Sequence, residues 1–417
     1  MTKPFEQNEQ RIERDILALS EIIDNAESGY TRRPFTKWHL ESRDWLIREM
    51  KNCSLDVWID AASNLIGKRE GTNAELPPIV IGSHTDSVVG GGRFDGIIGV
   101  LAGLEIVRQL NEKDIQLEHS LWIVDFTAEE ASEFGISTIG SRGMVGNLTE
   151  GDLNRKNAEG FILREALKIA GGRPDDLVKE ALKAGDVSLY LELHIEQGPV
   201  LEQTQHELGV VTGIVGIQRH KVVVEGQANH AGTTPMHMRF DALTGASELV
   251  LALEEIANMD YAEQVVGTVG RLFVEPNGAN VVPGRVVFDF EIRSLDLHAL
   301  DQMVEQMQTK IAHVEKKRQV SITMDQLSHS NAIIVQEDVV QGIEESCQCI
   351  GTTLRLPSGA GHDANQLAKV APVGMIFVPS KDGKSHCPEE WTDYTSVAKG
   401  IQALGTALLH FDKNHSN

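Results

Sequence analysis

The chain has 417 residues, of which 61 are acidic and 38 are lysine or arginine, so its formal net charge is −23. This length exceeds what one ordinary core holds, and two domains are expected. The 41% hydrophobic content argues against general disorder. The acidic balance argues against nucleic acid or an anionic membrane as partner.

The N-terminal stretch "MTKPFEQNEQRIERDILALSEII" lacks the basic segment and apolar run of a signal peptide. No stretch reaches the roughly 18 apolar residues that a membrane-spanning helix needs. The four cysteines are sparse and form no paired zinc-binding motif, so we interpret them as reduced thiols. Together these features predict a cytoplasmic protein.

The first 130 residues predict two helices, a pair of strands, a buried strand, a helix and a second buried strand. Both buried strands, "PPIVIGSH" and "HSLWIVDFTAEE", end in polar residues. Alternation of strand and helix predicts a mixed or parallel sheet with helices on its faces. Chemistry in such sheets gathers beyond the carboxyl ends of the strands. In chain order the predicted segments are residues 11–25, 42–53, 55–71, 77–84, 96–110 and 119–130.

The later chain predicts a second, inserted domain. "SLYLELHIEQGPVLE" is another strand that runs into polar residues, but beyond it "RHKVVVEGQANHAG" and "GRVVFDFEIRS" alternate with the period of half-exposed antiparallel strands. Helical segments lie between and after these strands. We therefore predict an α/β catalytic domain with a mixed sheet from residues 1–211 and 329–417, and a smaller α+β domain at 212–328.

The stretch "GSHTDSVVGGGRFDGIIGV" places metal-binding side chains at the end of a predicted strand. His84 and Asp86 share one face, so the Asp86 carboxylate is expected to accept the second ring N–H of His84. Glycines 90, 91, 92 and 96 allow the backbone to bring Asp95 back beside His84. The loop lacks the lysine and hydroxyl residues of a phosphate-binding P-loop.

Other strand ends complete a candidate metal site. Glu129 and Glu130 point in different directions, so one carboxylate can bind a metal while the other faces solvent or substrate. His194 and His386 end two further polar-tipped segments. Each residue alone has an ordinary structural interpretation, such as a hydrogen-bonded histidine; the order and spacing of the whole set indicate a metal site. Imidazole and carboxylate suit zinc, manganese, cobalt or nickel, and the candidate ligands are His84, Asp95, Glu130, His194 and His386.

With these residues in place, the chain resembles the aminoacylase and dipeptidase superfamily of two-metal amidohydrolases. The resemblance is strongest to the branch that holds N-carbamoyl-L-amino acid hydrolases, β-ureidopropionases and allantoate amidohydrolases. Matching stretches extend nearly from end to end. They include "GYTRRPFT", "DAASNLIGKREG", "TAEEASEFGISTIGSRGMVG", "ELHIEQGPVLE", "NHAGTTPM", "NGANVVPGRVVFDFEIRSLD", "SGAGHDA" and "VPSKDGKSHCPEEWT".

The resemblance implies a role for each site residue. Asp95 would bridge two divalent ions, with His84 and His194 on one and Glu130 and His386 on the other. Glu129 would be the general base that activates water, and Asp86 would orient His84. The peptide between Asp95 and Gly96 would often be cis in such enzymes.

The resemblance also implies a homodimer and a substrate site. The smaller domain would act as a lid and dimerisation domain, and His230 would reach the active site of the partner subunit. Asn280 and Arg293 would hold the substrate carboxylate. The remaining candidates for lining the cleft are Gln197, Gln218, Gly359, Ala360, Gly361 and His362.

The substrate is less sharply indicated than the reaction. "EFGISTIGSRGMVG" is similar to the carbamoylases, which favours an N-carbamoyl-L-amino acid cleaved to amino acid, carbon dioxide and ammonia. "IVGIQRH" is similar to a "GQRR" stretch of allantoate enzymes, so allantoate or β-ureidopropionate is the alternative. A peptide or acyl-amide substrate is less favoured. A binding module on an inactive hydrolase scaffold is disfavoured because all five ligands and Glu129 are present.

Overall fold

The computed structural model describes residues 5–414 and divides into two compact units. The larger unit comprises residues 1–212 and 335–417, and the smaller unit comprises residues 213–334. The chain passes between them within β6 and after β13. No helix among the described residues is both long and apolar enough to span a lipid bilayer.

The larger unit is built on a mixed sheet with the strand order β1-β2-β4-β3-β5-β15-β6, and β14 pairs with β6. β13, the last two residues of the smaller unit, pairs with the end of β6 and extends this order. The four central strands β4, β3, β5 and β15 are parallel, whereas the outer pairs are antiparallel. The parallel strands therefore end at one edge. The strands are Asp56–Ile59, Leu65–Arg69, Ile79–His84, Leu121–Phe126, Leu189–Ile195, Leu208–Ile214, Ile333–Ile334, Thr353–Ser358 and Val373–Val378 for β1–β6 and β13–β15.

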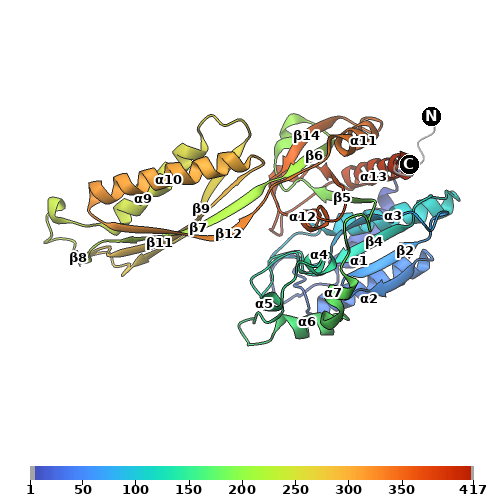
Figure 1. The fold of residues 1–417 in the computed structure, drawn as a ribbon, viewed down its shortest axis with the longest axis horizontal. Helices are drawn as coiled ribbons and strands as arrows, with labels where there is room; N and C mark the ends of the chain where they lie inside the picture. The colour runs from blue at the N-terminus through green and yellow to red at the C-terminus, as the bar shows by residue number, and fades with distance from the viewer. Residues whose placement is uncertain (1–4, 415–417) are drawn as a thin grey trace. The chain divides into compact units, whose positions relative to one another are not determined.

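The parallel strands β3, β5 and β15 are buried along their whole length because apolar helices cover the sheet. α3 contacts β3, β4 and β5, and α13 contacts β5, β15 and α3 (Figure 1). Every residue of α3 from Ile97 to Val107 is buried. The helices α1–α8 and α11–α13 span Glu9–Ser20, Lys37–Asn52, Ile97–Glu112, Ile139–Met144, Glu150–Leu153, Leu163–Ile169, Leu177–Glu180, Val200–Thr204, Glu337–Gln348, Ala364–Leu367 and Tyr394–Asn414.

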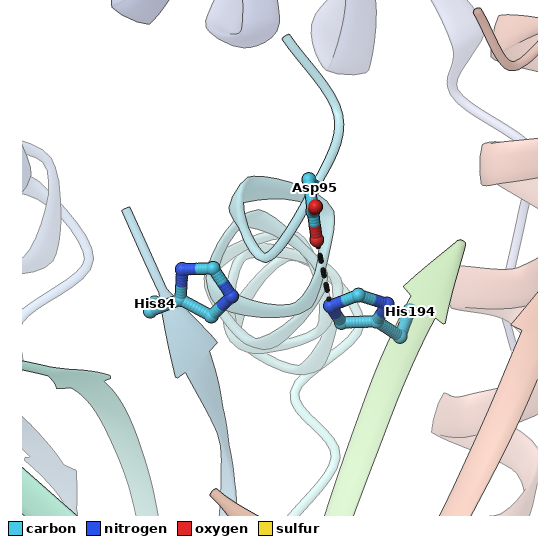
Figure 2. A group of neighbouring side chains, drawn as sticks. All are labelled: His84, Asp95 and His194. Atoms are coloured by element: carbon cyan, nitrogen blue, oxygen red, sulfur yellow. Dashed lines mark ion pairs between the residues drawn. The ribbon is translucent and has the colours of Figure 1, made fainter. Parts of the chain in front are cut away.

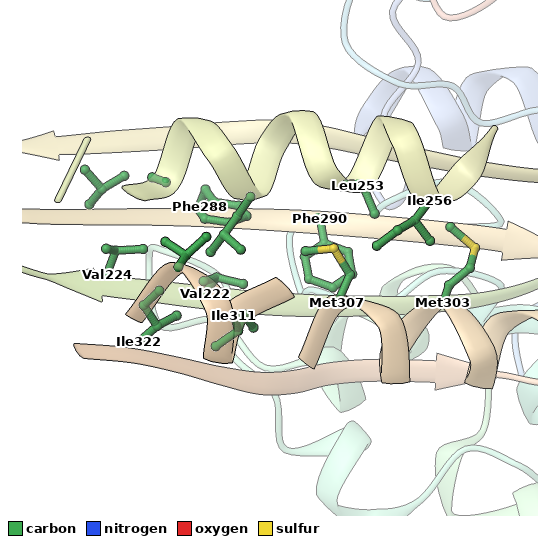
Figure 3. Packing of buried hydrophobic residues seen from close by; sticks show 14 of the residues in the cluster. Val222, Val224, Leu253, Ile256, Phe288, Phe290, Met303, Met307, Ile311 and Ile322 are labelled. Carbon is green, nitrogen blue, oxygen red and sulfur yellow. The ribbon is translucent and has the colours of Figure 1, made fainter. Parts of the chain in front are cut away.

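The smaller unit is a four-stranded antiparallel sheet of order β12-β7-β11-β9, with a separate two-stranded sheet of β8 and β10. β7 and β11 alternate between buried and less buried residues, and their buried face packs under α9 and α10 (Figure 3). The elements are β7 Gly216–Glu225, β8 Asn229–His230, α9 Ala242–Ala257, β9 Val265–Glu275, β10 Val281–Val282, β11 Arg285–Ser294, α10 Leu297–Arg318 and β12 Ser321–Ser330. The predicted fold class, an α/β unit with a mixed sheet and a smaller α+β unit, is confirmed.

Candidate metal centre

One group of donor side chains gathers at the carboxyl ends of β3 and β5. His84 is the last residue of β3, His194 lies near the end of β5, and Asp95 precedes α3. Figure 2 shows both imidazoles beside the Asp95 carboxylate. His194 Nε2 is 3.1 Å from Asp95 Oδ1, and one donor atom of each residue lies within 4.8 Å of the others. All three residues are buried.

Gly96 explains how Asp95 comes so close to His84. Its φ is +69°, which favours glycine. A Cβ at this position would lie 2.4 Å from the His84 ring, so a larger residue would displace the imidazole. The turn that precedes α3 is therefore built around His84.

A second group shares Asp95 with the first. His386 Nε2 is 3.2 Å from Asp95 Oδ2 and 3.2 Å from Glu130 Oε1. Donor atoms of these three residues also lie within 4.8 Å of one another. Each oxygen of Asp95 thus faces a different group, which is the arrangement that a bridging carboxylate requires.

The electrostatics of both groups favour positive charge. Burial by itself lowers the pKa of His84, but the carboxylates of Glu129, Asp86, Asp95 and Glu130 raise it well above its usual range. Hydrogen bonds with Asp95 and Glu130 raise the pKa of His386 to about 11. The carboxylates therefore attract a proton onto the imidazoles in the same way that they would attract a metal cation.

The donor set fits divalent metal ions. Each group offers nitrogen and oxygen donors of the kinds that zinc, manganese, cobalt and nickel accept. Several buried carboxylates in one place also require compensating positive charge.

Glu129 lies beside the first group. Its Oε2 is 3.7 Å from His84 Nε2, and the residue is 8% exposed. Burial raises the pKa of Glu129 well above its usual value, and the neighbouring carboxyls of Asp363 and Glu130 raise it further, against the attraction of His84. A buried carboxyl with a raised pKa is suited to accept and return a proton.

The predicted hydrogen bond between the His84 ring and the Asp86 carboxylate is wrong. His84 Nδ1 is 2.9 Å from the backbone oxygen of Asp86 and 4.0 Å from its carboxylate. The carboxylate instead accepts the backbone N–H groups of Glu129 and Glu130, both at 3.2 Å. Asp86 thus contacts His84 through its backbone and holds the Glu129–Glu130 segment through its side chain.

The expectation of a cis peptide after Asp95 is wrong. Within residues 5–414 the cis peptide bond is the one between Glu275 and Pro276.

The predicted cleft residues of the larger unit lie close to this cluster. Gln197 Nε2 donates to Asp95 Oδ2 at 2.8 Å. The ring of His362 lies 4.6 Å from that of His194, and its Nε2 is 2.7 Å from Ser358 Oγ. Gly359, Ala360 and Gly361 form the loop between β14 and His362.

A third set of possible donors shares His194 with the first. It consists of Glu192, His194 and His362. The Glu192 carboxylate already accepts hydrogen bonds from Ser83 and Tyr190, each at 2.8 Å. We therefore interpret this set as hydrogen-bonded residues that pack against the first group, and not as a separate metal site.

The predicted substrate contacts of the smaller unit fall at two ends of that unit. His230 in β8 pairs with Val281, next to Asn280, and the Ala231 N–H donates to the Asn280 backbone oxygen at 2.9 Å. Arg293 lies near the opposite end of β11 from Arg285. The eight residue steps from Arg285 to Arg293 span about 26 Å in a strand, so the structure separates Asn280 from Arg293 within one chain.

Gln218 lies inside the smaller unit. It is 4% exposed, and its Nε2 is 3.3 Å from Asp301 Oδ1 in α10. His220 Nε2 lies 3.3 Å from Gln218 Oε1. Within its own unit Gln218 therefore belongs to a polar cluster beneath α10.

Two residues that contact Asp95, Ser385 and Glu390, were not predicted from the sequence. Ser385 Oγ is 3.2 Å from Asp95 Oδ2, and Glu390 accepts the Asp95 backbone N–H at 3.1 Å. Ser385 directly precedes the candidate ligand His386, and this adjacency was the available signal. Glu390 lies 295 positions from Asp95, and no local pattern connects them.

A mixed sheet whose parallel strands end beside imidazoles and carboxylates is an arrangement typical of metal-dependent hydrolases. Residues 80–410 match the model of Peptidase family M20/M25/M40. The chain belongs to this family and is a hydrolase. The predicted resemblance is thereby confirmed.

Individual relatives support this assignment along the whole chain. The N-carbamoyl-L-amino acid amidohydrolase of Geobacillus stearothermophilus is 41% identical, with 95% of this chain and 96% of that protein covered. The allantoate amidohydrolase of Bacillus subtilis is 33% identical, with 94% and 95% covered. The crystal structure of a hydantoinase/carbamoylase family amidase from Burkholderia multivorans has a TM-score of 0.90 and 34% identity, with 96% and 97% covered.

Proposed function

We propose that the chain hydrolyses a ureido C–N bond of N-carbamoyl-L-amino acids. The carbamate that this cleavage leaves then decomposes, so the final products are the L-amino acid, carbon dioxide and ammonia. The observation that carries this proposal is the shared carboxylate of Asp95, whose two oxygens face two donor groups with Glu129 alongside. The name and 41% identity of the Geobacillus relative support the substrate class. The reaction rests on the site, and the substrate rests on the relatives.

Each residue of the larger unit has a task in this reaction. His84, Asp95 and His194 would hold one divalent ion, and Asp95, Glu130 and His386 would hold a second. Such ions supply Lewis acidity, which polarises the carbonyl and acidifies water. Glu129 takes the proton of the attacking water and returns it to the leaving nitrogen.

The smaller unit supplies substrate contacts. The Arg293 guanidinium binds the substrate carboxylate in a bidentate manner, and the Asn280 amide donates to it as well. His230 stabilises the oxyanion that forms when water adds to the carbonyl carbon.

We propose further that two chains form a homodimer in which His230 and Asn280 serve the partner's site. The separation of about 26 Å between the Arg285 and Arg293 ends of β11 supports this arrangement, because one lid cannot present both ends to one small substrate. β9 supports the homodimer too. It is an edge strand of the described sheet, its side chains Val266 and Phe273 are 46% and 56% exposed, and such an edge can pair with a second chain.

Mixed dimers test the shared site. Neither His230→Ala subunits nor Glu129→Gln subunits should be active alone. After random reassociation about a quarter of the wild-type rate should return, because each heterodimer keeps one intact site. Verified heterodimers without activity would exclude the shared site.

A substrate panel tests the proposed reaction. The metal-free protein is reconstituted separately with zinc, manganese, cobalt and nickel. Ammonia release is then measured from N-carbamoyl-L-amino acids, N-carbamoyl-β-alanine and allantoate. The proposal expects the highest kcat/KM for an N-carbamoyl-L-amino acid. A higher value for allantoate would favour the second candidate, which the similarity to the Bacillus subtilis allantoate amidohydrolase supports. The cytoplasmic location stays a prediction.

A further inference from the structure

Glu390 is a buried carboxylate that faces the loop before α3. It is 2% exposed. Its Oε1 accepts the backbone N–H groups of Phe94 at 3.0 Å and of Asp95 at 3.1 Å. Its Oε2 is 2.9 Å from Ser385 Oγ, which also lies 3.2 Å from Asp95 Oδ2. Glu390 therefore contacts the Asp95 backbone directly and reaches the Asp95 carboxylate through one hydroxyl.

The loop is shaped to admit this carboxylate. A Cβ on Gly92 would lie 2.1 Å from Glu390 Oε1, so residue 92 leaves room for Glu390 by having no side chain. Residues next to Glu390 and Gly92 also keep the two segments together. The Phe94 and Trp391 rings pack edge to face with centroids 5.3 Å apart. The Arg93 guanidinium also lies 5.5 Å from the centre of the Trp391 ring.

We propose that Glu390 is a positioning residue that fixes the orientation of the Asp95 carboxylate. Asp95 must present one oxygen to His194 and the other to His386, so a small rotation of its side chain would weaken both groups. Bonds from a buried carboxylate to two successive N–H groups restrain the backbone of Asp95, and Ser385 restrains Oδ2. This inference rests on the proposed function, in which Asp95 is a ligand of both ions.

The test measures binding of Co²⁺ to the metal-free full-length protein, by calorimetric titration and by the visible absorption of the bound ion. Glu390→Ala is expected to weaken Co²⁺ binding 10- to 100-fold, the usual effect of removing a group that holds a metal ligand. Its absorption spectrum should also change. Glu390→Gln keeps an oxygen acceptor for both N–H groups and should stay within about threefold of the wild type. Glu389→Ala is the matched control, because Glu389 is the exposed neighbour and should leave binding unchanged.

The outcomes separate this inference from the proposed function. If the wild type binds no Co²⁺, the proposed function fails. If the wild type binds Co²⁺ and Glu390→Ala binds it with the same affinity and spectrum, only the positioning role is overturned. If Glu390→Ala shows no cooperative thermal unfolding, Ser385→Ala replaces it. Weaker Co²⁺ binding by folded Ser385→Ala supports the role, and unchanged binding overturns it.

Discussion

The substitution Glu129→Gln isolates the proton-transfer step. Glutamine has the shape of glutamate, and the backbone N–H of residue 129 can still donate to Asp86, as it does at 3.2 Å. The amide cannot take a proton from water. A positioned general base contributes about 10²- to 10⁴-fold, so kcat should fall by that factor, or about 2.7–5.4 kcal/mol in the activation free energy.

The assay is steady-state ammonia release from an N-carbamoyl-L-amino acid, together with the metal content of the purified variant. KM should stay within about threefold of the wild type, because Glu129 adds little to ground-state binding in this account. Metal content should not change, since the five candidate ligands are untouched. A decrease in kcat of less than about tenfold, with metal content intact, would refute the assignment of Glu129 as the base.

Three other changes test separate parts of the account. Arg293→Ala should raise KM for carboxylate substrates by about tenfold or more, as one lost charge-assisted pair implies; an unchanged KM would exclude that contact. Arg43→Met should lower the free energy of unfolding in urea by about 3–5 kcal/mol, because it leaves the buried Asp125, now 2.9 Å from Arg43 Nε, without its charge partner. Burial raises the pKa of Asp60 to about 6, so its contribution to stability is full below about pH 4 and is lost as pH rises through 6. Asp60→Asn should therefore gain stability relative to the wild type as pH rises from about 4 to about 6, and stability curves that stay parallel over this range would contradict this.

Local patterns in the sequence predicted the fold class and the clustering of donor residues. The reason is that parallel strands carry their signal in short apolar runs, and the polar residues after such runs must meet at one edge of the sheet. His84 and His194 follow directly from this rule. Asp95 follows from the glycine-rich loop, whose Gly96 has the positive φ that such a turn requires.

Contacts between distant segments could not be predicted in this way. Glu390 and Asp95 are separated by 295 residues, and no periodicity relates them. The Asp86 side chain was predicted to bond to His84 because the two residues are close in sequence. In the fold the Asp86 carboxylate accepts the backbone N–H of Glu129 instead. The distance between Asn280 and Arg293 depends on how β11 runs through the sheet, which spacing along the chain does not reveal.

The most direct test of the central claim is ammonia release before and after complete removal of metal. The account predicts that the chelated protein loses its activity and regains it when a divalent ion is added. It also predicts two ions per chain at full activity, and about tenfold or greater loss of affinity for them in Asp95→Asn. Full activity after exhaustive chelation, verified by metal analysis, would contradict the claim that Asp95 and its neighbours hold catalytic ions.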